Sequence, residues 1–207
     1  MSWPEKITGT GSKDPPGRPI LKNYSLKPAW GTDFCTGPST PGSYPQKTGW
    51  KIKTMEAITK TLKLDISPET AFQKFVHDLN AWWPAEYTWS QESLERIYID
   101  ARKEGLCTEM GPHGFRCDWG RVKAIDPGKS IRFSWQISAK REPVPDPDKA
   151  SEVQVVFAPT ENGGTLLQFQ HDGFEKHGPD GAQYRDMMDS EPGWTYILEC
   201  FRSYCSS

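Results

Sequence analysis

The clearest alternation of hydrophobic and polar positions lies in residues 117–137 and predicts a β-hairpin. The sequence Asp-Pro-Gly-Lys at residues 126–129 suits a tight turn, because proline favours an early turn position and glycine the left-handed conformation that follows. After this turn, the apolar Ile131, Phe133 and Trp135 alternate with polar residues, which is the period of a strand with one buried face. A hairpin with an aromatic face is not stable alone in water, so the rest of the chain must cover that face.

Further segments have the alternation or the β-branched and apolar composition of strands. They are residues 57–65, 94–101, 105–110, 152–157 and 165–171. In the last of these, Leu167, Phe169 and His171 share the side that we expect to face the core. The Asn-Gly-Gly sequence at residues 162–164 predicts a hairpin turn between the last two strands.

Helical spacing appears near both ends of this series of strands. Ser67 is an expected N-cap, and the proline and glutamate after it suit a first turn, so the apolar positions 72, 75, 76 and 79 predict a helix. A short helix is expected over residues 181–188. Ser190 is the expected cap of a final helix. Its apolar stripe consists of Trp194, Ile197, Leu198 and Phe201.

The element order β-α-β-β-β-β-β-β-α predicts an α+β fold for residues 55–207, in which one curved antiparallel sheet is closed by the final helix. Residues 1–54 differ, because they hold eight Pro, seven Gly, eight basic and three acidic residues without apolar periodicity. Such a segment buries too little surface to offset its ordering entropy, which predicts a disordered, basic extension. It is either a partner-binding arm or a dispensable extension.

Composition and charge exclude several classes of function. The net charge of −2 gives no basic field for nucleic acid, and no apolar run reaches the length of about 18 residues that a membrane helix needs. The five cysteines form no Cys-x-x-Cys pair and no apolar signal-peptide core is present, so we expect a reducing, cytoplasmic environment. The histidines near residues 113, 171 and 177 lack the spacing of a zinc site, and no phosphate-binding loop occurs. We therefore expect no metal and no cofactor.

Several short motifs occur in a recognisable order along residues 56–204. They include Asp65-Ile66-Ser67-Pro68-Glu69, Trp82-Trp83-Pro84, Gly120-Arg121-Val122, Phe133-Ser134-Trp135, His171-Asp172-Gly173-Phe174 and Gly193-Trp194. In this order they resemble the helix-grip fold of the START/Bet v 1-like (SRPBCC) superfamily, and more narrowly its Activator of Hsp90 ATPase homologue 1-like (AHSA1-like) domains. The resemblance implies a curved antiparallel sheet wrapped around a long C-terminal helix.

The same resemblance implies a cavity between the sheet and that helix, in which members of the superfamily bind lipids, sterols, polyketides and other apolar molecules. We expect an apolar or aromatic ligand there. The candidate ligand-binding residues are Trp83, Trp119, Phe133, Trp135, Phe169, His171, Trp194 and Leu198. The alternative for the tryptophans is core packing without a ligand, because one buried indole covers roughly 150–250 Å². The family name also suggests Hsp90 as a partner, although a fold does not fix a function.

Acid–base chemistry is a second hypothesis, in which a cyclase- or hydrolase-like enzyme uses His171 and Asp118. It requires both side chains to face one ligand position. The alternatives are that His171 bonds to backbone or Asp172 and that Asp118 faces outward near Arg121. A nucleophilic cysteine paired with His171 is the least favoured hypothesis, because free cysteines are usually small buried apolar groups. We favour binding over catalysis, and the pattern leaves the oligomeric state open.

Overall fold

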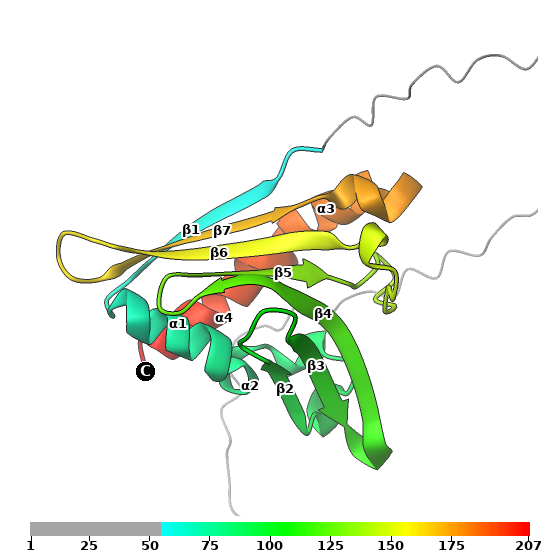
Figure 1. Cartoon of the computed structure of the whole chain (residues 1–207), viewed down its shortest axis with the longest axis horizontal. Coiled ribbons are helices and arrows are strands. Elements are labelled where there is room, and N and C mark those ends of the chain that lie inside the picture. The colour runs from blue at the N-terminus through cyan, green and yellow to red at the C-terminus, as the bar shows by residue number, and fades with distance from the viewer. Residues whose placement is uncertain (1–54) are drawn as a thin grey trace, which may run out of the picture. The chain divides into compact units, whose positions relative to one another are not determined.

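The computed structural model describes residues 55–207, and the predicted extension over residues 1–54 lies outside the described residues. Strands of the described part form one seven-stranded antiparallel sheet in the order β1-β7-β6-β5-β4-β3-β2 (Figure 1). The strands are β1 (Ile58–Leu64), β2 (Arg96–Ile99), β3 (Leu106–Gly111), β4 (Phe115–Asp126), β5 (Ser130–Trp135), β6 (Ser151–Pro159) and β7 (Thr165–Asp172). The predicted α+β fold with a curved antiparallel sheet is confirmed.

Two irregularities in register accompany the curl of the sheet. One lies between Cys107 and Thr108 of β3, and the other between Val122 and Ala124 of β4. A bulge adds an unpaired residue and bends its strand, which strengthens the local twist. The second bulge explains why the alternation before the turn at residues 126–129 is less regular than the alternation after it.

The helices are α1 (Pro68–His77), α2 (Leu79–Trp82), α3 (Gly181–Asp189) and α4 (Tyr196–Cys205). Ser67 caps α1 as predicted, since its Oγ accepts a hydrogen bond from the backbone N–H of Thr70. The predicted first helix is divided at Asp78, where α1 ends and α2 begins. Among the helices of the described part, none combines the length and apolar composition that crossing a bilayer requires.

The C-terminal helical segment begins with a π-helical turn over Glu191–Thr195 and continues as α4. Ser190 does not cap it, because its hydroxyl donates to the carbonyl of Met187 at the end of α3. Gly193 departs from helical geometry and lies tightly against the end of α3. The predicted apolar stripe is nevertheless correct. Its four residues Trp194, Ile197, Leu198 and Phe201 are buried.

The core lies between the inner face of the sheet and the helices α1 and α4. Phe75 of α1 contacts Phe157 of β6 at 5.7 Å between ring centroids and Phe201 of α4 at 5.1 Å, both edge to face. These contacts hold the two helices against each other and against the sheet.

Replacing Gly193 with Ala should destabilise the protein by about 1–3 kcal/mol, the usual cost of forcing extra atoms into a packed site. An added Cβ would lie 2.2 Å from the carbonyl oxygen of Met188, and backbone cannot swing aside as a flexible side chain can. Urea unfolding measures the loss. Gly163→Asn is the control, because φ is +79° there, no atom lies within 4 Å of the added Cβ, and asparagine tolerates this conformation. Equal effects of the two substitutions would contradict the argument.

Candidate functional site

Four indole rings gather on the inner face of the sheet, and we call them the Trp cluster: Trp83, Trp119, Trp135 and Trp194. Trp119 and Trp135 are supplied by β4 and β5, Trp194 by the π-helical turn, and Trp83 by the residue that follows α2. Alternation along β4 and β5 turns both strand residues inward. The chain therefore brings together four tryptophans that are far apart in sequence.

The rings of the Trp cluster contact one another. Trp83 lies 6.2 Å from Trp119, 6.3 Å from Trp135 and 6.2 Å from Trp194 between ring centroids. Trp135 in turn lies 5.1 Å from Trp194 and 5.7 Å from Trp119. These are ordinary distances for packed aromatic pairs. Core packing without a ligand, the alternative stated for the tryptophans, therefore accounts for much of the cluster.

Solvent exposure separates one ring from the other three. Trp119, Trp135 and Trp194 are only 2%, 4% and 1% exposed, whereas Trp83 is half-buried. Trp83 is also held by a short segment between α2 and β2, and not by a strand or a long helix. It is therefore the outermost ring of the cluster.

The other apolar candidates extend the cluster along the sheet. Phe133 packs edge to face on Trp119 with centroids 6.0 Å apart, and Phe169 lies 4.4 Å from Trp194. Leu198 is buried on α4 and also lines a groove between α4 and β1. Seven of the eight predicted residues thus belong to one aromatic assembly, and Leu198 lies at its border with the groove.

A chain of buried hydrogen bonds runs through His171. The indole Nε1 of Trp194 lies 2.9 Å from its Nδ1, and Ser151 Oγ lies 2.8 Å from its Nε2. Ser151 Oγ also lies 2.9 Å from Nε2 of His177, which is half-buried. The expected alternative, in which His171 bonds to backbone or to Asp172, is wrong.

The position of each proton along these hydrogen bonds follows from which groups can donate. An indole N–H can only donate, so Nδ1 of His171 must accept. A neutral imidazole then carries its proton on Nε2 and donates to Ser151, whose hydroxyl is free to donate to His177. An imidazolium at His171 would instead place two donors face to face at Trp194. Both ring nitrogens of His171 are therefore engaged within the protein.

The electrostatics agree with a neutral His171. Burial lowers its pKa well below the ordinary value, and the nearby His177 lowers it further. The pKa of His177 is also lowered, first by burial and then by Lys176. His171 is thus poised as a neutral acceptor for Trp194 and not as a group that changes charge near neutral pH.

The remaining indole N–H groups of the buried cluster differ in how they are satisfied. Trp135 Nε1 donates to the hydroxyl of Tyr184 on α3 at 2.7 Å. Trp119 Nε1 is buried and finds no acceptor among the described residues. Most buried donors in proteins are paired, so this one stands out.

Asp118 lies on the opposite face of the sheet from His171, and the proposed acid–base pair does not form. Its side chain is 39% exposed, accepts a hydrogen bond from Thr108 Oγ1 at 2.7 Å and pairs with Arg116 at 3.1 Å. The inward-facing neighbours at 117 and 119 are buried, so strand alternation forces residue 118 outward. The outward alternative is correct, although Arg116 takes the place expected for Arg121.

The cysteines of the hairpin are not activated. Burial raises the pKa of Cys107, and it raises the pKa of Cys117 to about 11. A nucleophilic cysteine needs a lowered pKa from a nearby base or cation, and the charged neighbours here are acidic. Among residues 55–207, no group of three His, Cys, Asp or Glu side chains is placed to hold a metal ion.

Residues 84–93, which we call the strap, follow Trp83 in the chain. Hydrogen bonds of residues 86, 87, 89 and 90 fasten the middle of the strap to the rest of the protein. They run from Tyr87 to the carbonyl of Pro192 (2.6 Å), from Tyr196 to Glu86 (2.7 Å), from Trp89 to the carbonyl of Arg141 (2.8 Å), and from the N–H groups of Trp89 and Ser90 to Glu109 (3.0 and 2.7 Å). The strap therefore positions Trp83 against the other three rings.

Sequence reasoning missed Ser151, His177 and Tyr184, which complete the polar contacts of the cluster. Ser151 has a signal in the sequence, since it shares its parity with the inward residues 153, 155 and 157. The predicted strand began one residue later and left it out. The other two lie outside the predicted strands, so periodicity gave no indication of their contacts.

The stability of the protein should fall as the pH drops below about 6.5, the ordinary pKa of histidine. In this range the unfolded chain takes up protons that the folded His171 does not, so acid favours unfolding by up to about 1.4 kcal/mol per pH unit. His177 adds a smaller part, because solvent screens it. Urea unfolding between pH 7.5 and 5.0 measures the slope.

A histidine variant outside the buried hydrogen bonds tests whether the pH dependence of stability comes from His171 and His177. His113→Asn, at an exposed turn where φ is +58°, should retain it. Nitrogen NMR of the wild-type protein should find Nε2 of His171 protonated and Nδ1 bare. A His171 resonance that titrates between pH 6 and 7 would contradict the assignment.

Comparison with known proteins gives the same fold. The family model for Activator of Hsp90 ATPase homolog 1-like proteins matches residues 65–206. The anthrahydroquino-γ-pyrone synthase Txn09, in its complex with SUM, is 25% identical with a TM-score of 0.53, and the match covers 72% of this chain and 97% of that one. The self-sacrificing resistance protein CalC from Micromonospora echinospora is 21% identical with a TM-score of 0.51, over 72% and 93% of the two chains.

Protein MLL2253 from Mesorhizobium loti is 18% identical with a TM-score of 0.51, and the match covers 72% of this chain and 95% of that one. No curated protein matches the chain significantly. CalC and MLL2253 show only that the fold is shared. The family model shows the family, because it matches most of the described residues. The chain therefore belongs to the family of Activator of Hsp90 ATPase homolog 1-like proteins, within the helix-grip superfamily.

Proposed function

We propose that the protein binds a planar aromatic small molecule at the Trp cluster, in the position that Trp83 occupies. The observation that carries this proposal is the buried indole N–H of Trp119, which has no acceptor among the described residues. Leaving a buried donor unpaired costs about 1–3 kcal/mol. A ligand oxygen beside this N–H would remove that cost, which favours a ligand with fused rings and a carbonyl or phenolic oxygen.

Trp83 is the residue that such a ligand would replace. It is the half-buried member of the cluster, and its stacked partner is Trp119, with an angle of 26° between the ring planes. A flat ligand would keep the same aromatic contacts after Trp83 swings outward. The strap limits how far Trp83 moves, because Tyr87 and Trp89, a few residues further along the chain, are bonded to the carbonyls of Pro192 and Arg141.

His171 has a different role in this proposal from the one expected of it. Both of its nitrogens are engaged, so contact with a ligand would cost the bond to Trp194 or the bond to Ser151. We infer that His171 positions Trp194, while Trp119 supplies the polar contact. Phe133, Trp135, Phe169 and Leu198 contribute apolar surface around the ligand.

The comparison with Txn09 supports an aromatic ligand. That protein is named as the synthase of an anthrahydroquino-γ-pyrone, and it shares 25% identity over nearly its whole length. A cyclase-like activity is the second candidate, and the observation that favours it is the path from His171 through Ser151 to the half-buried His177. Hsp90 is a partner suggested by the family description alone.

Two sulfonated dyes of equal charge test the proposed contact, namely anthraquinone-2-sulfonate and anthracene-2-sulfonate. Both offer three fused rings, but only the quinone presents carbonyl acceptors. Isothermal titration should give tighter binding of the quinone by about two- to tenfold, the value of one net hydrogen bond. Trp119→Phe should erase this difference by removing the N–H while keeping a ring. Trp83→Ala should strengthen the binding of both dyes by vacating the position.

Trp82→Phe is the control, because its indole N–H is already paired with the carbonyl of Phe75 and lies outside the Trp cluster, so the preference for the quinone should survive it. The proposal fails if neither dye binds to the wild-type protein or to Trp83→Ala. A preference for the quinone that persists in Trp119→Phe would place the polar contact elsewhere. Turnover of a polyketide-like substrate that is lost in His177→Gln would favour the enzymatic candidate instead.

A further inference from the structure

The sheet has one edge that nothing in the described chain covers. β1 is the terminal strand of the sheet and pairs with β7 alone. At the opposite edge, the side chain of Asn80 accepts the backbone N–H of Ile97 in β2 at 2.8 Å, which occupies part of that edge. Alternate residues of β1 therefore direct unpaired N–H and C=O groups away from the sheet.

Natural proteins usually protect such an edge with a proline, a bulge, a very short strand or charged side chains such as lysine. Of these, β1 has only the lysines, Lys60 and Lys63. It is seven residues long, contains no proline, and keeps an unbroken register with β7 from Ile58 opposite His171 to Leu64 opposite Thr165. Its geometry is that of a template for one more strand.

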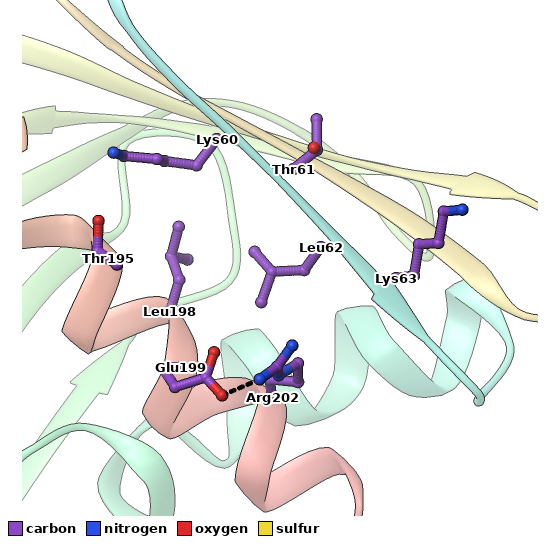
Figure 2. Close-up of a pocket in the computed structure, with 8 residues that line it drawn as sticks. All are labelled: Lys60, Thr61, Leu62, Lys63, Thr195, Leu198, Glu199 and Arg202. Atoms are coloured by element: carbon purple, nitrogen blue, oxygen red, sulfur yellow. Dashed lines mark hydrogen bonds and ion pairs between the residues drawn. The ribbon is translucent and has the colours of Figure 1, made fainter.

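The two faces of β1 differ beside this edge. On the inner side, a groove of about 360 Å³ separates β1 from α4. Figure 2 shows Leu62 of β1 and Leu198 of α4 pointing toward one another across this groove. The outer face of β1, β7 and β6, which holds a hollow of about 350 Å³, presents mainly polar side chains. They include Thr59, Thr61, Gln154, Gln168 and Gln170.

The two faces match the side-chain period of an added strand. Successive side chains of an extended peptide point to opposite faces of the sheet. A peptide paired with β1 would direct one set toward the inner groove beside Leu62 and the other set alongside Thr59 and Thr61 on the outer face. The edge therefore suits a peptide in which apolar and polar residues alternate.

The charges beside the edge favour an acidic peptide. The lining of the inner groove carries Lys60, Lys63 and Arg202 against the single acid Glu199. Glu199 pairs with Arg202, and Lys60 pairs with Asp189 at 2.7 Å. Lys63 is exposed on β1 and has no ion pair within the described residues. The local excess is positive although the chain as a whole carries a net charge of −2.

We propose that the β1 edge, with the groove between β1 and α4, is a docking site for an extended acidic peptide segment of a partner protein, which adds to the sheet as an eighth strand. Main-chain hydrogen bonds would supply much of the affinity, and the apolar groove on one face with the polar outer face on the other would select the alternating side chains. Two other occupants fit the charges less well. Residues 1–54 are basic, and a second copy would bring two further lysines, Lys60 and Lys63, to the same edge.

The test uses the full chain and the acetylated, amidated heptapeptide DVTLEVD as probe. Isothermal titration should detect its binding, whereas the heptapeptide KVTLKVK should bind far more weakly because its charges are reversed. Methylating the backbone nitrogens of either its odd or its even residues blocks one edge of the peptide. One set should abolish binding and the other should leave it intact, since only one edge of the peptide pairs with β1.

Charge reversals on the protein locate the site. Lys63→Glu and Arg202→Glu should each weaken binding by about two- to fivefold, the scale of one exposed ion pair. Lys103→Glu makes the same charge change in the exposed turn between β2 and β3, at the far edge of the sheet, and should have no effect. Hydrogen exchange should show new protection in residues 58–64 when the peptide is bound.

Three results would overturn the proposal. The first is the absence of binding by DVTLEVD, and the second is an equal effect of the two methylation patterns. The third is full protection of residues 58–64 in the free protein, since the edge would then already be occupied by a second copy or by residues 1–54. Sedimentation velocity on the free protein would tell these two occupants apart.

Discussion

The indole N–H of Trp194 can only donate a hydrogen bond, and this constraint organises the polar part of the core. It makes Nδ1 of His171 an acceptor, which places the ring proton on Nε2 and directs it to Ser151. The bond joins the π-helical turn before α4 to the end of β7. A buried imidazole with both nitrogens satisfied is inexpensive only while it is neutral, so burial and the lowered pKa belong to the same arrangement.

The Trp cluster serves the core and the candidate site with the same rings. A buried indole contributes apolar contact on both faces but needs a partner for one N–H. The N–H of Trp135 donates to Tyr184 and the N–H of Trp194 donates to His171, and these hydrogen bonds orient both rings. Trp119 lacks one, so its ring is held by packing alone. The cluster therefore contains two rings held by a polar partner and one held by packing alone.

Much of the fold follows from local pattern, because alternation along a strand and spacing along a helix are visible in sequence. The inward parity of Leu167, Phe169 and His171 and the stripe on the last helix are examples that the structure confirms. The partners of His171 could not be derived in this way, since Ser151 and His177 meet it only through strand pairing and the turn after β7.

The orientation of Asp118, in contrast, could be derived from the sequence, because strand parity alone places it outward once Trp119 is assigned to the core. Its partner Arg116 depends on the geometry of the curled hairpin and was not predictable.

The two sides of the π-helical turn and α4, taken together, carry different chemistry, and this separates the Trp cluster from the β1 edge. Trp194 and Phe201 face the core, whereas Thr195, Glu199 and Arg202 border the groove along β1. Leu198 belongs to both, since it is buried and also forms the floor of the groove opposite Leu62. The bond between Trp194 and His171 ties the start of this helical segment to β7, the strand that pairs with β1. The same segment therefore contributes to the core through Trp194 and to the groove through Thr195 and Leu198.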